Sequence, residues 1–175
     1  RRAFEDFFSK QLPVLGVCNG CQMLSQLREI IPGAENWPSF ERNNSGQFES
    51  RTVMVKVSGN SSPWLEGLSG CVVPVAVAHG EGRVELGDLT RAVELDSLVA
   101  MRYVGPSDEP TEDYPYNPNG SPGGIAAITA ASGSMLAMMP HPERTFRSSQ
   151  LIVSDPGWKG YSPWMQFFRN ARRLI

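Results

Sequence analysis

Hydrophobic residues recur along the chain with two different periods, and these periods predict helices interleaved with strands. Helical spacing marks residues 2–11, 23–31 and 164–174. Apolar alternation or a short apolar run marks the predicted strands, which are residues 13–17, 53–57, 72–78, 98–104, 124–129 and 134–139. Because helices and strands interleave, we expect an α/β fold with a mixed, mainly parallel sheet flanked by helices.

Turn and cap residues predict where several of these elements begin and end. Ser132-Gly133 should join the last two strands as a hairpin. Asp88 can cap a helix in the middle of the chain. Ser162 can cap the final helix, because Pro163 suits the first helical position.

Two stretches lack a clear period. Residues 35–50 are polar and irregular, and we expect Trp37, Phe40 and Phe48 to anchor them to the core. Residues 105–124 form a long loop rich in Pro, Gly, Asn and Asp. Loops of this length are uncommon inside a compact domain unless they are functional, so this loop is predicted to be a lid or a contact surface.

The composition is that of one globular domain. The chain has 175 residues, of which 41% are hydrophobic and 19% charged, so it can bury a core without disulfides or a metal. The net charge of −2 provides no basic excess for binding nucleic acid or an anionic membrane. No apolar run approaches the roughly 20 residues that span a bilayer.

Two further features concern the cellular context. The three cysteines cannot all pair within the chain, which favours a reducing compartment, and we expect a cytoplasmic protein. The chain begins with Arg1 rather than Met and opens directly on a helical pattern. We therefore expect residues 1–175 to be a single domain from a larger, multidomain protein.

The most informative motif is Gly16-Val17-Cys18-Asn19-Gly20, between a predicted strand and a predicted helix. Small residues two before and two after a nucleophile suit a strained strand-to-helix elbow, in which bulky neighbours would clash. A thiol on that turn lies at a helix N-terminus, where the dipole favours the reactive thiolate and the N–H groups can bind an oxyanion. The motif therefore predicts that Cys18 is a nucleophile.

Other interpretations of this cysteine stay open. Cys18 and Cys21 form a Cys-x-x-Cys motif, which occurs in redox pairs and in half-sites for zinc. Zinc would need two more ligands, and the remaining candidates, Cys71, His79 and His141, include no second close-spaced pair. Cys18 could also be an inert core cysteine between structural glycines. Cys21 is expected in the core, and Cys71 is expected to be structural.

The second motif is the segment Pro-His141-Pro142-Glu143. Pro142 favours an extended backbone at His141, and residues two apart in an extended segment point the same way. A carboxylate that orients an imidazole lets the imidazole serve as the base for a nucleophile. Glu143 could instead form a weak surface ion pair with Arg144 or Arg147. Together with the thiol in the elbow, the motif predicts a Cys-His-Glu triad.

A third motif, His79-Gly80-Glu81-Gly82, follows a predicted buried strand. It could be a hairpin turn with an exposed histidine, or a loop whose backbone amides bind a small polar ligand. His79 is also the alternative base for Cys18. We favour His141, because Glu143 lies at the right offset from it on a rigid backbone.

These residues resemble a known family. The segment Gly-Val-Cys18-Asn-Gly-Cys-Gln, followed far downstream by Pro-His141-Pro-Glu143, is similar to the catalytic residues of the class I, or triad, glutamine amidotransferases. A finer resemblance covers nearly the whole chain in order. It is to the C-terminal glutaminase domains of large, single-chain phosphoribosylformylglycinamidine (FGAM) synthases. It rests on five segments: RNNSGQFESR from Arg42, AHGEGR from Ala78, YPYNPNGSP from Tyr114, MMPHPER from Met138 and PWMQFFRNAR from Pro163.

The resemblance implies a flavodoxin-like amidotransferase fold and a role for each site residue. Cys18 would attack the side-chain amide of glutamine and form a γ-glutamyl thioester. His141 would protonate the leaving ammonia and later activate water, while Glu143 would hold His141. The backbone N–H of Asn19 would bind the oxyanion. The residues that would contact the substrate glutamine are Gln22, His79, Gly80 and Glu81.

The resemblance also implies a partner outside this chain. The ammonia would pass to a synthetase domain of the same polypeptide, which converts formylglycinamide ribonucleotide to the amidine in purine biosynthesis. That domain would use ATP and magnesium, and we expect no cofactor and no metal site within residues 1–175.

One departure from the family concerns the start of the chain. The family's glutaminase domains begin with further strands and a Gly-rich loop that supplies another oxyanion donor, and these residues are missing here. Losing such a donor costs about 3–4 kcal/mol of transition-state stabilisation, so the chain alone is expected to be a poor glutaminase. Two alternative functions are a catalytically silent docking module of the same fold and another cysteine-histidine hydrolase.

Overall fold

The structure of the chain is a computed structural model, and it describes residues 1–59, 62–87, 89–152 and 155–174. Its strands form a large sheet and a small one. The large sheet has the order β1 (Val14–Val17), β8 (Met135–Met138), β7 (Ile125–Thr129), β6 (Val99–Tyr103), β3 (Glu49–Val57) and β4 (Val72–His79). The small sheet pairs β2 (Ser39–Arg42) with β5 (Glu81–Glu85).

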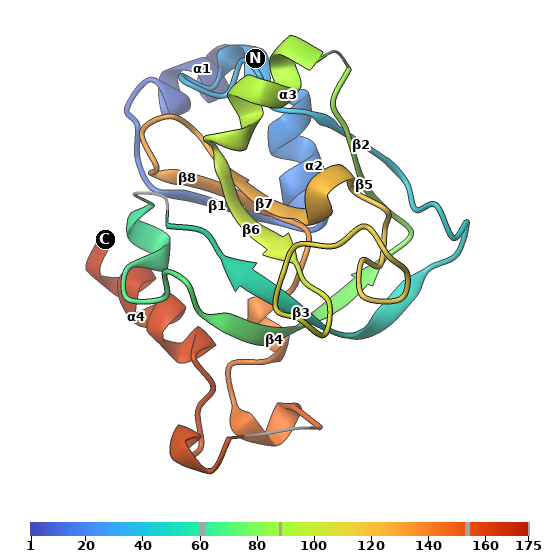
Figure 1. The fold of residues 1–175 in the computed structure, drawn as a ribbon. Helices are drawn as coiled ribbons and strands as arrows, with labels where there is room; N and C mark the ends of the chain where they lie inside the picture. Colours follow the sequence, from blue (N-terminus) through green and yellow to red (C-terminus); the bar gives the residue numbers. More distant parts are fainter. Residues whose placement is uncertain (60–61, 88, 153–154, 175) are drawn as a thin grey trace.

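Helices lie on both sides of the large sheet (Figure 1). One side carries α1 (Arg2–Phe8), α2 (Asn19–Gln26) and α3 (Leu89–Asp96), and the other side carries α4 (Trp164–Leu174). None of the helices in the described part of the chain is both long enough and apolar enough to cross a membrane.

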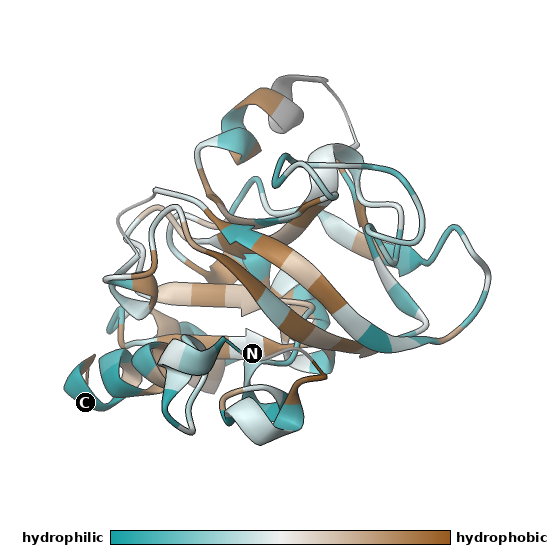
Figure 2. Cartoon of the chain, turned by 60° about the horizontal axis from the view of Figure 1, so that its bottom comes forward, coloured by the Kyte–Doolittle hydropathy of each residue, from teal (hydrophilic) through white to brown (hydrophobic). Residues whose placement is uncertain are grey.

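Each face of the large sheet packs against its own core. Along β8, Met135 and Ala137 contact the core that includes Leu24 of α2, whereas Leu136 and Met138 contact the core that includes Phe167 of α4. This alternation follows from the period of two along a strand. Figure 2 accordingly shows the strands of the sheet mostly brown and the surrounding loops mostly teal or white.

The expectation of a mixed sheet flanked by helices is confirmed, but the expectation that the sheet is mainly parallel is wrong. Within the described residues, β1 with β8 is the one parallel pair, and the other pairs of the large sheet are antiparallel. Parallel neighbours need a crossover connection, usually a helix. A tight turn joins β7 to β8, and the described part of the β3–β4 connection contains only a 3-10 turn (Pro63–Leu65).

Several local predictions can be compared with the structure. The hairpin is confirmed, and so is the cap at Ser162, whose Oγ accepts a hydrogen bond from the N–H of Trp164 at 3.2 Å. The first helix ends at Phe8, earlier than predicted. The predicted cap Asp88 lies outside the described residues.

The predicted anchors of residues 35–50 differ in their burial. Trp37 is fully buried, and its Nε1 donates to the carbonyl of Thr129 at 2.8 Å, while Phe40 is partly buried. The prediction for Phe48 is wrong, because its side chain is 67% exposed. Glu49, the first residue of β3, faces inward, so its neighbour in the chain must face outward.

The turn between β1 and α2 depends on one glycine. A Cβ added at Gly16 would lie 2.6 Å from Cδ1 of Leu24 and 2.7 Å from the carbonyl oxygen of Gly20. Only glycine therefore lets the end of β1 approach the first turn of α2 so closely. A Cβ added at Gly20 would meet no described atom within 4 Å. The two glycines of the sequence motif thus differ, since Gly16 is a steric requirement and Gly20 is not.

Replacing each glycine by alanine tests this difference. Gly16→Ala should lower the free energy of unfolding by about 1–3 kcal/mol, because the first turn of α2 must shift. Gly20→Ala should be neutral, or stabilise the fold by up to about 1 kcal/mol, because alanine favours a helix. Urea denaturation followed by the fluorescence of the buried Trp37 and Trp164 measures both variants. Equal losses in the two variants would contradict this account of the turn.

Candidate active site

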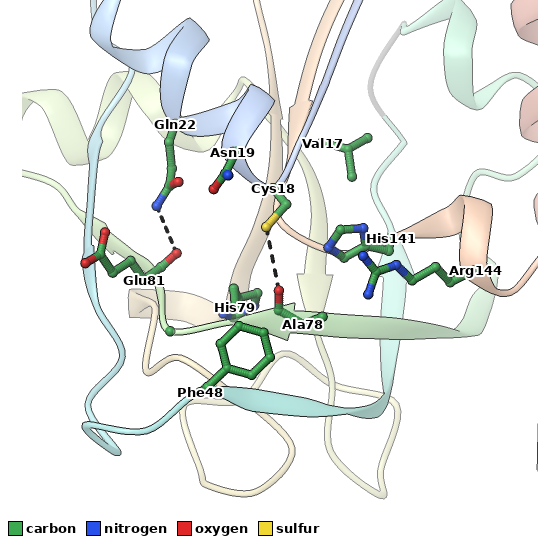
Figure 3. A pocket seen from close by; sticks show the side chains of 11 residues that line it. Val17, Cys18, Asn19, Gln22, Phe48, Ala78, His79, Glu81, His141 and Arg144 are labelled. Carbon is green, nitrogen blue, oxygen red and sulfur yellow. Dashed lines mark hydrogen bonds between the residues drawn. The ribbon is translucent and has the colours of Figure 1, made fainter.

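A pocket of about 540 Å³ opens where the ends of several strands meet (Figure 3). Most of the predicted site residues line it, although they come from distant parts of the sequence. The predicted residues that line the pocket are Cys18, Asn19, Gln22, His79, Gly80, Glu81 and His141. The remaining predicted residue, Glu143, contacts His141 from outside this lining.

The parallel pairing of β1 with β8 brings Cys18 and His141 to one edge of the sheet. Val17 pairs with Met138, and the N–H of Cys18 donates to the carbonyl of Met138 at 2.8 Å. His141 follows β8, and its N–H donates to the carbonyl of Ala76 in β4 at 2.8 Å. Backbone hydrogen bonds to the sheet therefore fix both residues.

Cys18 has a strained backbone at the N-terminus of α2. Its φ of 53° and ψ of −109° lie in a region that non-glycine residues rarely adopt. This strain is the geometry expected of a nucleophile elbow. The sulfur lies in the pocket, where the thiol donates to the carbonyl oxygen of Ala78 at 3.7 Å (Figure 3).

The surroundings of Cys18 do not favour a resting thiolate, contrary to the sequence-based prediction. Burial raises the pKa of the Cys18 thiol above its ordinary value, and the carboxylate of Glu143 adds to the increase. The N–H of Asn19 at the helix N-terminus and the guanidinium of Arg144 lower the pKa of Cys18, but their effect is smaller than that of burial. The thiol is therefore neutral at neutral pH and needs a base in order to react.

Glu143 orients the ring of His141. The Nδ1 atom of His141 lies 2.6 Å from Oε1 of Glu143. Because a carboxylate only accepts hydrogen bonds, Nδ1 carries the proton and donates, which leaves Nε2 with its lone pair. Nε2 is buried and has no hydrogen-bond partner among the described residues, and the ring lines the same pocket as Cys18 (Figure 3). His141 thus has the tautomer that a general base requires.

Glu143 takes part in both of the contacts that the sequence left open. It lies in a 3-10 turn (Pro142–Arg144), whereas the extended backbone was predicted at His141, which forms an isolated antiparallel bridge with Ala76. The predicted contact between the two side chains forms. The same Oε1 that accepts from His141 lies 3.4 Å from Nε of Arg144. The surface ion pair therefore exists in addition to the contact with His141.

His79 is buried, so the interpretation as an exposed histidine in a hairpin turn is wrong. The residue is 3% exposed at the end of β4, and the following strand, β5, pairs with β2. Burial lowers the pKa of His79 to about 4, and repulsion between the protonated forms of His79 and His141 adds to the decrease, so the His79 ring is neutral at neutral pH. Neither ring nitrogen has a hydrogen-bond partner in the described part of the chain. Without a bound carboxylate, His79 is a weaker candidate for the base than His141.

Gln22 and Glu81 lie on the side of the pocket away from His141 in Figure 3. Nε2 of Gln22 donates to the backbone carbonyl of Glu81 at 3.0 Å. This bond ties α2 to the segment that follows β4, which also includes the lining residue Gly80. The two segments together form a polar wall opposite the imidazole.

Four lining residues had no predicted role in the pocket, namely Val17, Phe48, Ala78 and Arg144. Phe48 is largely exposed, and no local signal identified it because strand register decides where it points. The side chain of Arg144 is 53% exposed, and it reaches the pocket beside His141 (Figure 3). Its place directly after the Pro-His-Pro-Glu segment was a signal that could have identified it.

The other two cysteines lie apart from this chemistry. Cys21 lies in α2 and is fully buried in the core that this helix covers. Burial raises the pKa of its thiol well above the ordinary value. Cys71 is half-buried and packs against the other core. All three cysteines are free. Among the residues that the structure describes, no group of three or more His, Cys, Asp or Glu side chains could hold a metal ion.

Two solved structures share the fold of this chain. The structure of PurLQS from Thermotoga maritima is similar over 93% of this chain and 62% of that chain, with a TM-score of 0.66 and 25% sequence identity. The structure of a putative GMP synthase component from Thermoplasma acidophilum shares the fold over 93% of this chain and 56% of that one, with a TM-score of 0.50 and 15% identity. This chain therefore spans less than two thirds of either protein.

The family comparison covers the whole sequence. Residues 1–175 match the family described as the CobB/CobQ-like glutamine amidotransferase domain. The fold of the chain and the thiol-imidazole pocket at its strand ends fit that description. The chain belongs to the family of CobB/CobQ-like glutamine amidotransferase domains.

Proposed function

We propose that this domain releases ammonia from glutamine through a γ-glutamyl thioester on Cys18. One observation carries the proposal. A thiol on a strained helix N-terminus shares a pocket with an imidazole that a carboxylate holds in the tautomer of a base. Membership of a glutamine amidotransferase family supports the choice of glutamine as the substrate.

The first half of the proposed reaction forms the thioester. Nε2 of His141 takes the thiol proton, and the sulfur of Cys18 bonds to the carbonyl carbon of the glutamine side chain. The carbonyl oxygen becomes an oxyanion, which the N–H of Asn19 stabilises. His141 then returns the proton to the nitrogen, the carbon–nitrogen bond breaks, and ammonia leaves.

The second half restores the enzyme. His141 takes a proton from water, and the resulting hydroxide attacks the thioester carbon. The carbon–sulfur bond breaks, the proton returns to Cys18, and glutamate leaves. Glu143 keeps Nδ1 of His141 protonated through both halves. The first half starts from a neutral thiol, which suits a pocket whose burial opposes ionisation of Cys18.

The polar wall opposite His141 is proposed to bind the substrate. Gln22, Gly80 and Glu81 offer an amide, a backbone segment without a side chain and a carboxylate on that side of the pocket. The neutral ring of His79 can donate or accept one hydrogen bond there without adding charge. These groups suit the polar amino-acid end of glutamine.

We further propose that the ammonia serves an FGAM synthase. A synthetase domain, in the same polypeptide, would convert formylglycinamide ribonucleotide to the amidine with ATP and magnesium bound outside residues 1–175. The support is the set of long sequence segments shared with that family and the likeness to PurLQS at 25% identity.

Removing the thiol should separate the two activities of the full-length protein. Cys18→Ala should lower glutamine-dependent synthesis by roughly a thousandfold or more, because no thioester can form. Synthesis from added ammonia should stay unchanged. Cys71→Ala, outside the pocket, is the matched control and should keep both activities. Equal loss of both activities in Cys18→Ala would make Cys18 structural, and unchanged glutamine use would refute the thioester.

The two partners of the thiol should differ in their importance. His141→Ala should lower glutamine hydrolysis by roughly a thousandfold, whereas Glu143→Ala should lower it by roughly 10–100-fold, because an orienting residue contributes less than the base. Steady-state ammonia release by the full-length protein measures both. Arg147→Ala is the control, since this guanidinium lies over the ring of Phe146 instead of in the pocket. Equal losses at His141 and Glu143 would contradict the assigned roles.

The raised pKa of Cys18 should appear in its reactivity. In the absence of glutamine, alkylation of Cys18 by iodoacetamide should rise about tenfold per pH unit and still be rising at about pH 9, because only the thiolate reacts. Arg144→Gln should move this profile to higher pH, since the guanidinium lowers the pKa of Cys18. Mass spectrometry of the labelled peptide measures the rate. A plateau below about pH 8 would show that the resting residue is already a thiolate.

A further inference from the structure

Amide donors from two other segments fix the pocket wall that follows β4. Nδ2 of Asn43 donates to the carbonyl of His79 at 2.8 Å, and its backbone N–H donates to the carbonyl of Gly80 at 3.0 Å. Nδ2 of Asn119 donates to the carbonyl of Gly82 at 2.8 Å. The backbone of this wall therefore depends on residues that do not themselves line the pocket.

Asn119 is fully buried and belongs to the long loop of residues 105–124. Its Oδ1 accepts hydrogen bonds from the N–H of Ser121 at 3.0 Å and from the hydroxyl of Ser121 at 2.7 Å. Oγ of Ser121 in turn accepts from the N–H of Val84 at 3.0 Å. One loop thus binds β5 at two points, at Gly82, which directly follows the lining residue Glu81, and at Val84.

The middle of this loop, at residues 114–116, lies at the surface. Tyr114 and Tyr116 are 64% and 43% exposed. Arg51 of β3 holds this part, because its guanidinium lies 4.9 Å from the ring centroid of Tyr114 and donates to the carbonyl of Pro115 at 2.9 Å. The loop therefore runs from an anchored surface segment to a buried contact with the pocket wall.

We propose that Asn119 is a positioning residue of the glutaminase site, which fixes the pocket wall through its hydrogen bond to Gly82 and links that wall to the surface loop 105–124. The inference rests on the proposed function and deepens it by naming a residue that does not touch the substrate. Loss of this donor leaves the buried carbonyl of Gly82 with only the hydroxyl of Ser121, at the long distance of 3.5 Å, so this part of the wall is held less firmly. Binding and orientation of glutamine then suffer although Cys18 and His141 are intact, because small displacements of a positioning group have large effects.

A second buried asparagine of the same loop provides a matched control. Asn117 is 1% exposed, and its Nδ2 donates to the carbonyls of Thr111 and Ser121 at 3.1 and 2.9 Å. Its Oδ1 accepts from the N–H groups of Asn119 and Gly120. These bonds stay within the loop. Replacement of either asparagine by aspartate keeps the shape and the acceptor oxygen and replaces the NH2 donor by a carboxyl oxygen. The buried carboxyl group is common to both variants, so the comparison between them isolates the lost bond to Gly82.

The test compares Asn119→Asp with Asn117→Asp in the full-length protein. Asn119→Asp should raise KM for glutamine about tenfold and change kcat by less than about threefold, with ammonia-dependent synthesis unchanged. Asn117→Asp should change KM by less than about threefold. Hydrogen exchange in residues 79–84, measured without glutamine, should be faster in Asn119→Asp than in the parent protein and in Asn117→Asp.

Equal changes in KM and in exchange for the two variants would overturn the proposal and leave Asn119 as an ordinary structural residue of the loop. If Asn119→Asp does not fold, Ser121→Ala is measured instead, because it removes the hydroxyl that holds Oδ1 of Asn119 as well as the acceptor of the Val84 N–H. Unchanged KM and unchanged exchange in that variant would also overturn the proposal. A parent protein that does not hydrolyse glutamine refutes the proposed function, and the exchange data then still decide whether Asn119 holds the wall.

Discussion

Parallel pairing between β1 and β8 is the constraint on which the candidate active site depends. In a parallel pair the carboxyl ends of both strands lie at the same edge of the sheet. Cys18 leaves β1 at that edge, and His141 follows β8 beyond it, so two residues far apart in the sequence share one pocket. An antiparallel pairing of these two strands would place the thiol and the imidazole at opposite ends. The remaining strands can be antiparallel without affecting this geometry, because they support the pair and line the far wall.

Burial gives the pocket its chemical character. It shelters a thiol and two imidazoles from water, and it opposes the charged forms of Cys18 and His79. Cys18 is therefore neutral at rest in spite of the N–H of Asn19, and His79 is neutral at neutral pH. His141 differs from His79 in having a carboxylate at Nδ1. The chemistry that fits this environment is proton transfer between neutral partners, in which charge develops only where hydrogen-bond donors or Glu143 can stabilise it.

Features that depend on residues close together in the sequence could be predicted. The elbow at Cys18, the contact between His141 and Glu143 and the core position of Cys21 each follow from residues within a few positions of one another. Features that strand register decides could not be predicted. The sheet has one parallel pair where more were expected, and Phe48 is exposed where burial was expected. Both differences arise because strands distant in the sequence determine the direction of each strand and the side to which its neighbouring side chains point. The bond from Asn119 to Gly82 has the same origin, since it joins the loop 105–124 to β5, and only the fold brings these two segments together.

The central claim is that the thiol of Cys18 attacks glutamine bound in this pocket. A diazo ketone analogue of glutamine tests it directly, because such a reagent alkylates the nucleophile of the site that binds it as substrate. After treatment of the full-length protein, peptide mass spectrometry should find the label on Cys18 alone, and an excess of glutamine should suppress it. Label on Cys21 or Cys71, or an unmodified Cys18, would contradict the account.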